Sequence, residues 1–318
     1  MKLTCTSIKK LVNGACHSRE ENGYTYFYHF SEKQLEHFEK RYQFWYERAL
    51  LQTGIKIELI TDSESLSLDY YSPSVYSGDN SIDVYVNDMA VYVHHIEKSG
   101  KGKLECVLPC GKKTVTVYLP IDVPVGIKSI TVDGTYKSVR SRRAKLLAIG
   151  DSITQGYGAG IAGSTYINSL YRKTGYDILC QGIGGYRYEK GSVMPIDGYI
   201  PDKILVALGT NYYDDETYDY ATNIEEFYET LHSVYGDTPV LTVTPVYRFD
   251  EAFKPERFQK VVEKIKSVCA KYPNIKVLCG WNLIYHISEC YLDPVHPNAY
   301  GSELMAQGIS DFMKKIRF

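Results

Sequence analysis

A short polar run near the middle of the chain carries a serine that can act as a nucleophile. The run GDSITQG, residues 150–156, follows an apolar segment, and Ser152 is its third residue. A serine hydroxyl attacks an ester when a nearby base takes its proton and N–H donors stabilise the oxyanion. A serine after a strand is also a common helix N-cap. On its own Ser152 favours the cap, so other residues must decide between the two interpretations.

A second run, DPVHPN at residues 293–298, supplies a candidate base. Imidazole ordinarily titrates near neutral pH, so a histidine such as His296 suits a group that takes and returns a proton. Asp293 precedes it by three residues, so a tight turn would bring the carboxylate beside the imidazole ring and fix its tautomer. The alternatives are a turn aspartate before Pro294 and a surface histidine.

Two further runs supply candidate donors for an oxyanion. Asn211, in LGTN at residues 208–211, offers a neutral side-chain N–H. Gly185, in GIGGYRY at residues 182–188, can present a backbone N–H with no side chain in the way. The N–H of Ser152, at the start of a helix, is a third donor. As alternatives, Asn211 can cap a helix or form an Asx turn, and Gly185 can lie in a flexible loop.

Three of these four runs follow segments with the pattern of strands buried on both faces. Apolar segments at residues 145–150, 176–182, 203–209, 239–245 and 275–280 alternate with helical patterns at 162–175, 220–236, 254–273 and 298–316. This order predicts a three-layer, flavodoxin-like α/β domain with a mainly parallel five-stranded sheet over residues 141–318. Functional groups are expected at the carboxyl ends of its strands.

The first 140 residues have a different pattern, which predicts a β-sandwich or jelly-roll domain over residues 1–140. Period-two alternation at residues 55–60, 81–88, 112–120 and 127–134 indicates strands, with a turn at Asn87-Asp88. One helical segment is expected near residues 31–50. The basic run at residues 137–145 indicates a solvated junction between the domains in preference to a nucleic-acid patch.

Together the four runs resemble the sequence blocks of the SGNH, or GDSL-type, hydrolases. The matching residues, in order, are Gly150-Asp151-Ser152, Gly185, Gly209-Thr210-Asn211 and Asp293-Pro294-Val295-His296. The resemblance implies a nucleophile at Ser152, a base at His296 and its partner at Asp293. It also implies an oxyanion hole made by Ser152, Gly185 and Asn211. One departure is Cys180, which stands where the second block often opens with asparagine, and it leaves these roles unchanged.

A β-rich domain before such a catalytic half is similar to the layout of two-domain carbohydrate esterases, which remove acetyl groups from sugars. We therefore predict a serine esterase that hydrolyses short acyl esters, preferably O-acetyl groups on carbohydrates, through an acyl-enzyme. Tyr157, Tyr186 and Tyr188 follow the catalytic runs and are expected to line the substrate cleft, with packing as the alternative. Other functions left open are a lipase or thioesterase, an acyltransferase using the same residues, and a catalytically silent carbohydrate-binding protein.

The composition of the chain indicates which kinds of ligand and partner to expect. The 318 residues carry 36 Lys and Arg against 38 Asp and Glu, a net charge of -2, which provides no basic field for nucleic acid. No segment approaches the ~20 apolar residues of a membrane span, and the N-terminus lacks a signal-peptide pattern. The eight cysteines include no C-x-x-C pair and are expected as free thiols in the cytoplasm. We expect a small-molecule or oligosaccharide ester as substrate, and neither a metal nor an organic cofactor.

Overall fold

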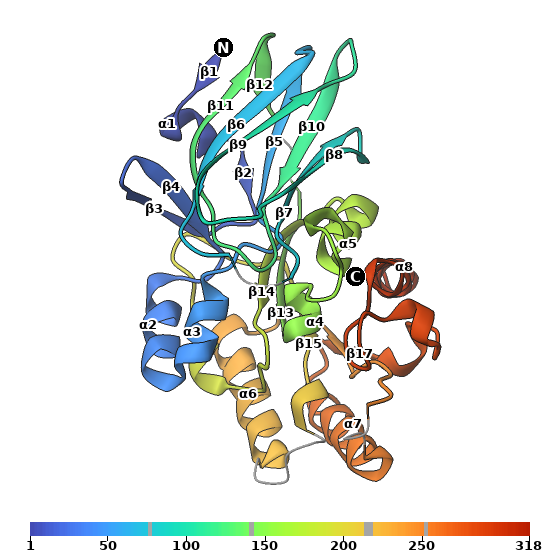
Figure 1. The fold of residues 1–318 in the computed structure, drawn as a ribbon. Helices are drawn as coiled ribbons and strands as arrows, with labels where there is room; N and C mark the ends of the chain where they lie inside the picture. The colour runs from blue at the N-terminus through green and yellow to red at the C-terminus, as the bar shows by residue number, and fades with distance from the viewer. Residues whose placement is uncertain (76–77, 140–142, 213–218, 251–253) are drawn as a thin grey trace.

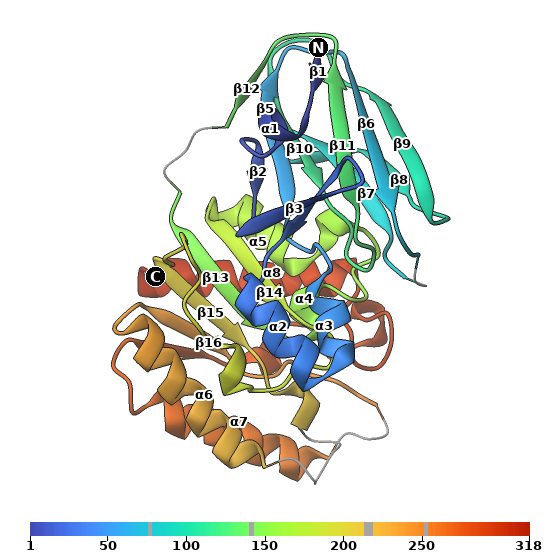
Figure 2. The same ribbon diagram turned by 90° about the vertical axis from the view of Figure 1, so that its left-hand side faces the viewer.

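The computed structural model of the chain describes residues 1–75, 78–139, 143–212, 219–250 and 254–318. An antiparallel β-sandwich forms one end of the molecule, and a three-layer α/β domain forms the other (Figure 1, Figure 2). The N-terminus lies on the sandwich and the C-terminus on the α/β domain (Figure 1). This architecture confirms the predicted fold class.

The sandwich consists of two antiparallel sheets whose facing sides enclose a hydrophobic core. Its elements are β1 (Lys2–Leu3), α1 (Cys5–Ile8), β2 (Val12–Asn13), β3 (His17–Glu21), β4 (Tyr24–Tyr28), β5 (Lys56–Thr61), β6 (Ser65–Ser72), β7 (Ser81–Val86), β8 (Met89–His95), β9 (Gly100–Val107), β10 (Lys113–Tyr118), β11 (Gly126–Val132) and β12 (Tyr136–Ser138). One sheet has the order β3-β4-β11-β6-β9, with β1 paired to β11, and the other has the order β12-β5-β10-β7-β8, with β2 paired to β5. Alternate side chains such as Ile57, Leu68 and Val117 point inward and are fully buried.

The hairpin between β7 and β8 shows how the local sequence sets the strand register. Asn87 and Asp88 have φ values of 48° and 67°, the left-handed conformation that a two-residue hairpin turn requires. Asparagine and aspartate enter this region more readily than other residues with a side chain. Val86 consequently pairs with Met89 across the turn. The turn predicted at these two residues is confirmed.

The α/β domain is centred on five parallel strands in the order β14-β13-β15-β16-β17. These are β13 (Lys145–Gly150), β14 (Asp177–Gly182), β15 (Lys203–Ala207), β16 (Val240–Val243) and β17 (Ile275–Leu278), and each falls within a predicted segment. The first strand, β13, has β14 on one side and β15 on the other. The winding of the chain therefore changes direction at β13, and a crevice forms at such a point beyond the carboxyl ends of the strands.

Helices cover both faces of this parallel sheet. On one face lie α5 (Tyr166–Thr174) and α8 (Ala299–Ile316), and on the other lie α6 (Tyr220–Tyr235) and α7 (Pro255–Cys269). The second face is completed by α2 (Glu32–Arg41) and α3 (Gln43–Ala49), which come from the N-terminal region (Figure 2). Phe38 and Trp45 of these helices share one core with Leu147 and Leu179 of the sheet. The α/β core is thus completed by residues that precede most of the sandwich strands.

The helical segment expected near residues 31–50 consists of two helices that meet at Tyr42. Ser31 begins α2 with a capping box, in which its side chain accepts from the Gln34 N–H and the Gln34 side chain accepts from the Ser31 N–H. Tyr42 has φ of -165° and ψ of 113°, an extended conformation that ends α2 before α3 begins. This break gives α3 its own direction, and α3 reaches the catalytic pocket described below.

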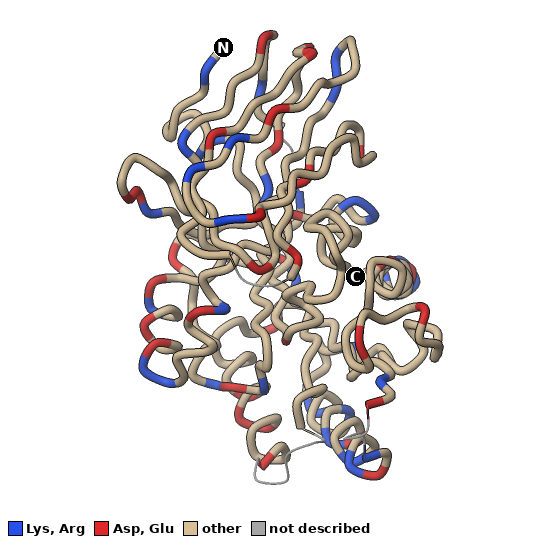
Figure 3. Tube along the Cα trace, in the orientation of Figure 1, with Lys and Arg blue, Asp and Glu red and all other residues tan. Residues whose placement is uncertain are grey.

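Basic and acidic residues are interspersed over both parts of the molecule, in agreement with the small net charge (Figure 3). The predicted boundary between residues 140 and 141 lies outside the described residues. Across the described ranges, no helix has the combination of length and apolar character that crossing a bilayer requires.

Candidate active site

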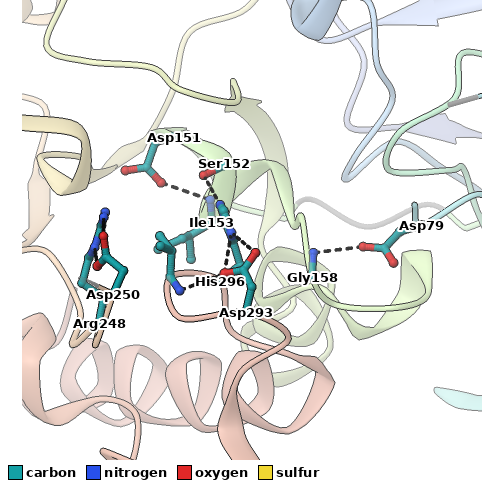
Figure 4. Close-up of polar contacts among 10 residues, drawn as sticks. Asp79, Asp151, Ser152, Ile153, Gly158, Arg248, Asp250, Asp293 and His296 are labelled. Atoms are coloured by element: carbon teal, nitrogen blue, oxygen red, sulfur yellow. Dashed lines mark hydrogen bonds and ion pairs between the residues drawn. The ribbon is translucent and has the colours of Figure 1, made fainter. Parts of the chain in front are cut away.

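The candidate residues gather beyond the carboxyl ends of three adjacent strands. Ser152 comes just after β13, Gly185 just after β14 and Asn211 just after β15. Because β13 lies between β14 and β15, the three residues meet at the point where the winding changes direction. Asp293 and His296 reach the same place from the loop that precedes α8 (Figure 4).

Ser152 is the first residue of a short helix, α4 (Ser152–Gln155), and Asp151 is the N-cap of that helix. The Asp151 carboxylate accepts a hydrogen bond from the Ile153 N–H at 3.1 Å. The helix ends after one turn at Gly156, whose φ of 94° suits glycine. Because Asp151 supplies the cap, the Ser152 hydroxyl is available to another partner. The alternative that Ser152 is the helix cap is therefore wrong.

Ser152, His296 and Asp293 form a hydrogen-bonded chain (Figure 4). The Ser152 Oγ lies 2.9 Å from His296 Nε2. His296 Nδ1 lies 2.8 Å and 3.0 Å from the two carboxylate oxygens of Asp293. This arrangement places an imidazole between a hydroxyl and a carboxylate, which is the geometry in which a serine proton can pass to a histidine.

The loop conformation keeps Asp293 charged. Burial alone would raise the pKa of Asp293, but hydrogen bonds from the Val295 N–H, the His296 ring and the His296 N–H lower it below its ordinary value. A charged carboxylate at Nδ1 holds the ring proton on that nitrogen and leaves Nε2 to accept from the serine. The Tyr157 ring packs edge-on against the His296 ring, with centroids 4.7 Å apart, and restricts its rotation.

Three candidate oxyanion donors belong to the residues around the Ser152 hydroxyl. Gly185 has φ of 68°, which glycine adopts readily, and its carbonyl accepts from Trp45 Nε1 at 3.3 Å. The Asn211 amide donates one hydrogen to the Tyr186 carbonyl at 2.9 Å and has a second hydrogen to donate. Within the described residues, no acceptor is bonded to the N–H of Ser152 or of Gly185.

An open pocket of about 480 Å³, here called the catalytic pocket, is lined by all five candidate residues, which are Ser152, Gly185, Asn211, Asp293 and His296. Its wall is completed by Phe44 and Arg48 of α3 and by Asp122 of the loop between β10 and β11. Sequence reasoning missed these three residues, because no local motif marks them and they lie far from Ser152 along the chain. The position of Phe44 and Arg48 follows from the packing of α3 onto the parallel sheet, and Asp122 is held there by its hydrogen bond from Gln155.

The three tyrosines expected in the cleft separate into two groups. Tyr157 lines the catalytic pocket. Tyr186 and Tyr188 are 1% and 2% exposed and belong to the core under α2 and α6. The Tyr186 hydroxyl is hydrogen-bonded to Ser192, and its ring packs against Phe38 and Trp45. The expectation for Tyr186 and Tyr188 is corrected here, since their rings turn inward and the packing alternative describes both.

A buried arginine brings positive charge to the catalytic pocket. Arg248 lines the pocket and forms a bidentate ion pair with Asp250 (Figure 4). Burial raises the pKa of Asp151 to about 7, while its hydrogen bond from Ile153 and the charge of Arg248 oppose this rise. Sequence reasoning missed Arg248, whose neighbours in the chain resemble an ordinary loop after a strand.

The site contains the kinds of group that acyl transfer requires. These are a hydroxyl that can attack, an imidazole that can accept and return a proton, and candidate N–H donors around the hydroxyl. In the part of the chain that the structure describes, no group of three His, Cys, Asp or Glu side chains is arranged to hold a metal.

Comparison with known families agrees with this fold. Residues 148–304 match the GDSL-like lipase/acylhydrolase family, a range that contains every candidate catalytic residue. This match confirms the SGNH or GDSL-type resemblance of the four sequence runs. A comparison with curated proteins found no match.

Solved structures extend the likeness to the whole chain. A salicylyl-acyltransferase, SsfX3, from a tetracycline biosynthetic pathway matches with a TM-score of 0.83 and 20% identity over 100% of this chain and 97% of that chain. A protein described as a GDSL-like lipase from Bacteroides ovatus matches with a TM-score of 0.81 and 18% identity over 100% and 98% of the two chains. An acetyl xylan esterase, Est2A, from Butyrivibrio proteoclasticus matches with a TM-score of 0.69 and 14% identity over 100% and 98%. Sandwich and α/β domain therefore occur together in all three proteins.

Proposed function

We propose that the protein is a serine esterase that removes short acyl groups, preferably acetyl, from carbohydrates. The observation that carries this proposal is the hydrogen-bonded chain from Ser152 through His296 to Asp293 at the edge of an open pocket. The match of residues 148–304 to the GDSL-like lipase/acylhydrolase family supports an acyl-transfer reaction at this site.

In the proposed mechanism, Ser152 attacks the ester carbonyl while His296 Nε2 takes its proton. The N–H groups of Ser152 and Gly185 and the Asn211 amide stabilise the negative charge that develops on the carbonyl oxygen. His296 then donates the proton to the leaving alcohol, and an acyl-enzyme remains on Ser152. Water, activated by the same histidine, releases the acid and restores the serine.

The lining of the catalytic pocket supports a short acyl group on a polar substrate. Arg48, Asp122, Gln155 and Arg248 bring charged or amide groups into the pocket wall. Such a wall leaves little apolar surface for a long fatty acyl chain to bury. A sugar offers hydroxyl groups that such a wall can bind. The similarity to an acetyl xylan esterase points to the same substrate class.

Substitution of the proposed nucleophile tests the reaction. Ser152→Ala is expected to abolish hydrolysis of a chromogenic acetate ester and release of acetate from acetylated xylo-oligosaccharides. A rate near that of the wild-type protein would remove Ser152 from the mechanism. A wild-type protein that binds sugar but hydrolyses neither ester would support the catalytically silent alternative.

Chain-length preference tests the acyl group. Acetate esters are expected to react faster than octanoate esters, because the polar pocket wall gives a longer chain little apolar surface to bury. The reverse order would favour a lipase or thioesterase.

An acyltransferase is the second candidate, and the whole-chain similarity to a salicylyl-acyltransferase favours it. Both reactions share the acyl-enzyme and differ in whether water or another alcohol resolves it. The rate of acyl transfer to an added sugar, divided by the rate of acid release, distinguishes the two. A ratio that rises with sugar concentration and exceeds one would identify a transferase.

A further inference from the structure

A second pocket lies outside the catalytic site, on the outer face of the sandwich sheet that contains β4. It encloses about 540 Å³, which is within the range of small-ligand sites. Four tyrosines line it, and we call it the tyrosine pocket; they are Tyr24, Tyr26, Tyr28 and Tyr71. None of the proposed catalytic residues belongs to it.

The strand pattern explains why these tyrosines gather on one face. Tyr24, Tyr26 and Tyr28 alternate along β4, so their rings stand on the outer face, while Phe27 points into the core. Side chains also alternate along β6, so the Tyr71 ring points to the outer face, and its centroid lies 5.5 Å from that of Tyr24. The outward rings therefore form one surface instead of isolated side chains.

A glycine in the neighbouring strand allows this close packing. A Cβ atom at Gly126 of β11 would lie 2.6 Å from the Tyr26 ring and 2.8 Å from the Tyr24 Cβ. Any larger residue at this position would push the rings away from the sheet. The sequence thus places beside Tyr24 and Tyr26 the one residue type that lets them approach the backbone of β11 this closely.

The hydroxyl groups of the pocket are available to a ligand. Among the described residues, none of the four tyrosine hydroxyls has a hydrogen-bond partner, and none is a fully buried unsatisfied group. Burial raises the pKa of Tyr26 to about 12, so its hydroxyl keeps its proton at neutral pH. Each hydroxyl can then donate one hydrogen bond and accept others.

The charges at the rim balance each other. Glu21 and Lys101 line the pocket with opposite charges, and Asn22 adds a neutral amide. The residues that line the pocket thus offer aromatic rings, hydroxyls and both hydrogen-bond polarities, and their two charges are of opposite sign. The charged ends of Arg19 and Lys128 lie 5.7 Å and 6.0 Å from the ring centroids of Tyr28 and Tyr24. Such a lining suits a neutral ligand that has apolar C–H faces and many hydroxyl groups, which describes a pyranose ring.

The tyrosine pocket also adjoins the catalytic pocket through two shared segments. Arg48 lines the catalytic pocket, and Leu50, two residues further along at the end of α3, lines the tyrosine pocket. In the loop between β10 and β11, Asp122 lines the catalytic pocket and Pro124 lines the tyrosine pocket. Residues two apart are within about 7 Å of each other along the chain.

We propose that the tyrosine pocket is a second binding site for a neutral sugar unit, separate from the catalytic pocket. The choice of an oligosaccharide as the probe rests on the proposed function, but the pocket itself does not depend on ester hydrolysis. The site would hold an unmodified part of a glycan while the catalytic pocket acts on an ester.

The test is calorimetric binding of unacetylated xylohexaose, cellohexaose and mannohexaose to the protein and to variants of the tyrosine pocket. Tyr71→Ala is expected to weaken the binding of at least one hexasaccharide by about tenfold, because one aromatic contact is lost. Tyr26→Phe removes a hydroxyl while keeping the ring and serves as the variant less sensitive to folding. Tyr92→Ala on β8, a tyrosine that is 38% exposed and outside the pocket, is the matched control and should bind normally.

Esterase measurements separate this proposal from the proposed function. Tyr71→Ala should leave hydrolysis of a small chromogenic acetate within twofold of wild type and raise KM for an acetylated hexasaccharide with kcat unchanged. Binding that is lost in Tyr71→Ala from a protein without esterase activity would support the pocket and overturn the proposed function. Absence of binding to all three sugars, or equal binding by Tyr71→Ala and wild type, would overturn the pocket. Binding of tetramethylammonium in place of the sugars would also overturn it, since aromatic faces attract such cations.

Discussion

The Gln155 side chain links Asp122 of the sandwich to the backbone of the candidate oxyanion hole. Gln155 Nε2 donates to Asp122 Oδ1 at 3.0 Å, and Gln155 Oε1 accepts from the Gly184 N–H at 2.7 Å. Gly184 directly precedes Gly185, whose N–H is a proposed oxyanion donor. Gln155 is 2% exposed, so water cannot easily replace either hydrogen bond. The buried Gln155 amide thus connects the β10–β11 loop of the sandwich to the backbone that carries the proposed oxyanion donor, the Gly185 N–H.

Removal of this amide should impair turnover more than substrate binding. Gln155→Ala is expected to lower kcat by about tenfold with little change in KM, because two hydrogen bonds that position the Gly184–Gly185 backbone are lost. Steady-state kinetics with a chromogenic acetate measure both constants. Gln259→Ala, on the exposed face of α7, is the control and should have wild-type kinetics. A kcat for Gln155→Ala within twofold of wild type would show that the link has no catalytic effect.

Asp122 should produce a pH dependence of folding stability. Burial raises the pKa of Asp122 from 3.8 to about 6, partly offset by the nearby charge of Arg48. Between these two values the folded protein binds more protons at this site than the unfolded chain, so this group makes stability fall as the pH rises. Asp122→Asn should flatten that part of the curve of unfolding free energy against pH, measured by urea denaturation. An unchanged slope between pH 4 and 6 would mean that Asp122 has an ordinary pKa.

Asn211 should matter in the transition state and little in the ground state. Asn211→Ala is expected to lower kcat by about 10²–10³, the usual effect of removing one oxyanion donor, with KM nearly constant. Asn211→Asp keeps the size of the side chain and removes the donor, so it should lose at least as much activity. If both variants keep more than a third of the wild-type kcat, Asn211 has no part in the oxyanion hole.

Asp293 should act through the tautomer of His296. Asp293→Asn replaces an acceptor at Nδ1 with an amide, and we expect kcat to fall by about 10³–10⁴ because the ring can then carry its proton on Nε2. The lowered pKa of Asp293 makes a second prediction. Its charged form stabilises the fold above pH 3.8, and this contribution is lost as the pH falls through the folded-state pKa. The variant should therefore lose less stability than wild type below pH 3.8; parallel acid-denaturation curves would contradict this.

The α/β domain should not fold normally without the N-terminal helices. A fragment of residues 143–318 lacks Phe38 and Trp45, which are 0% and 6% exposed in the core they share with Leu147. Exposure of this sheet face should give a fragment that binds a hydrophobic dye and unfolds without a cooperative transition. The full-length chain, measured in the same way, is the reference. A cooperative, active 143–318 fragment would show that the two helices are dispensable.

Local pattern was sufficient to predict most of the secondary structure in the α/β domain. The buried strands read as short apolar runs, and their helices read as separate amphipathic segments, so order and approximate bounds followed from period and composition. The same holds for the turn at Asn87 and Asp88, because two residues alone set its left-handed conformation. The sequence also predicted Ser152, Asn211, Asp293 and His296 as candidate site residues, because each follows a predicted strand or precedes the last predicted helix.

The direction in which several side chains point depends on tertiary packing, which a short stretch of sequence does not reveal. Tyr186 and Tyr188 follow β14 in the same motif as Gly185, yet their rings turn into the core because α2 and α6 cover that face. The capping role belongs to Asp151, since its carboxylate and not the Ser152 hydroxyl lies against the Ile153 N–H. Both outcomes depend on the direction in which a side chain leaves the backbone.

The wall of the catalytic pocket required the folded chain for the same reason. Arg48 and Asp122 have no motif of their own. Asp122 reaches Gln155, and Arg48 lies 3.7 Å from Asp122, because the β10–β11 loop and α3 pack against the carboxyl ends of the parallel strands. Periodicity reports which residues are buried, and motif spacing reports which residue types lie near one another in the chain. Contacts between segments more than 100 residues apart arise from burial of apolar surface shared by both, as in the core that joins Trp45 to Leu179.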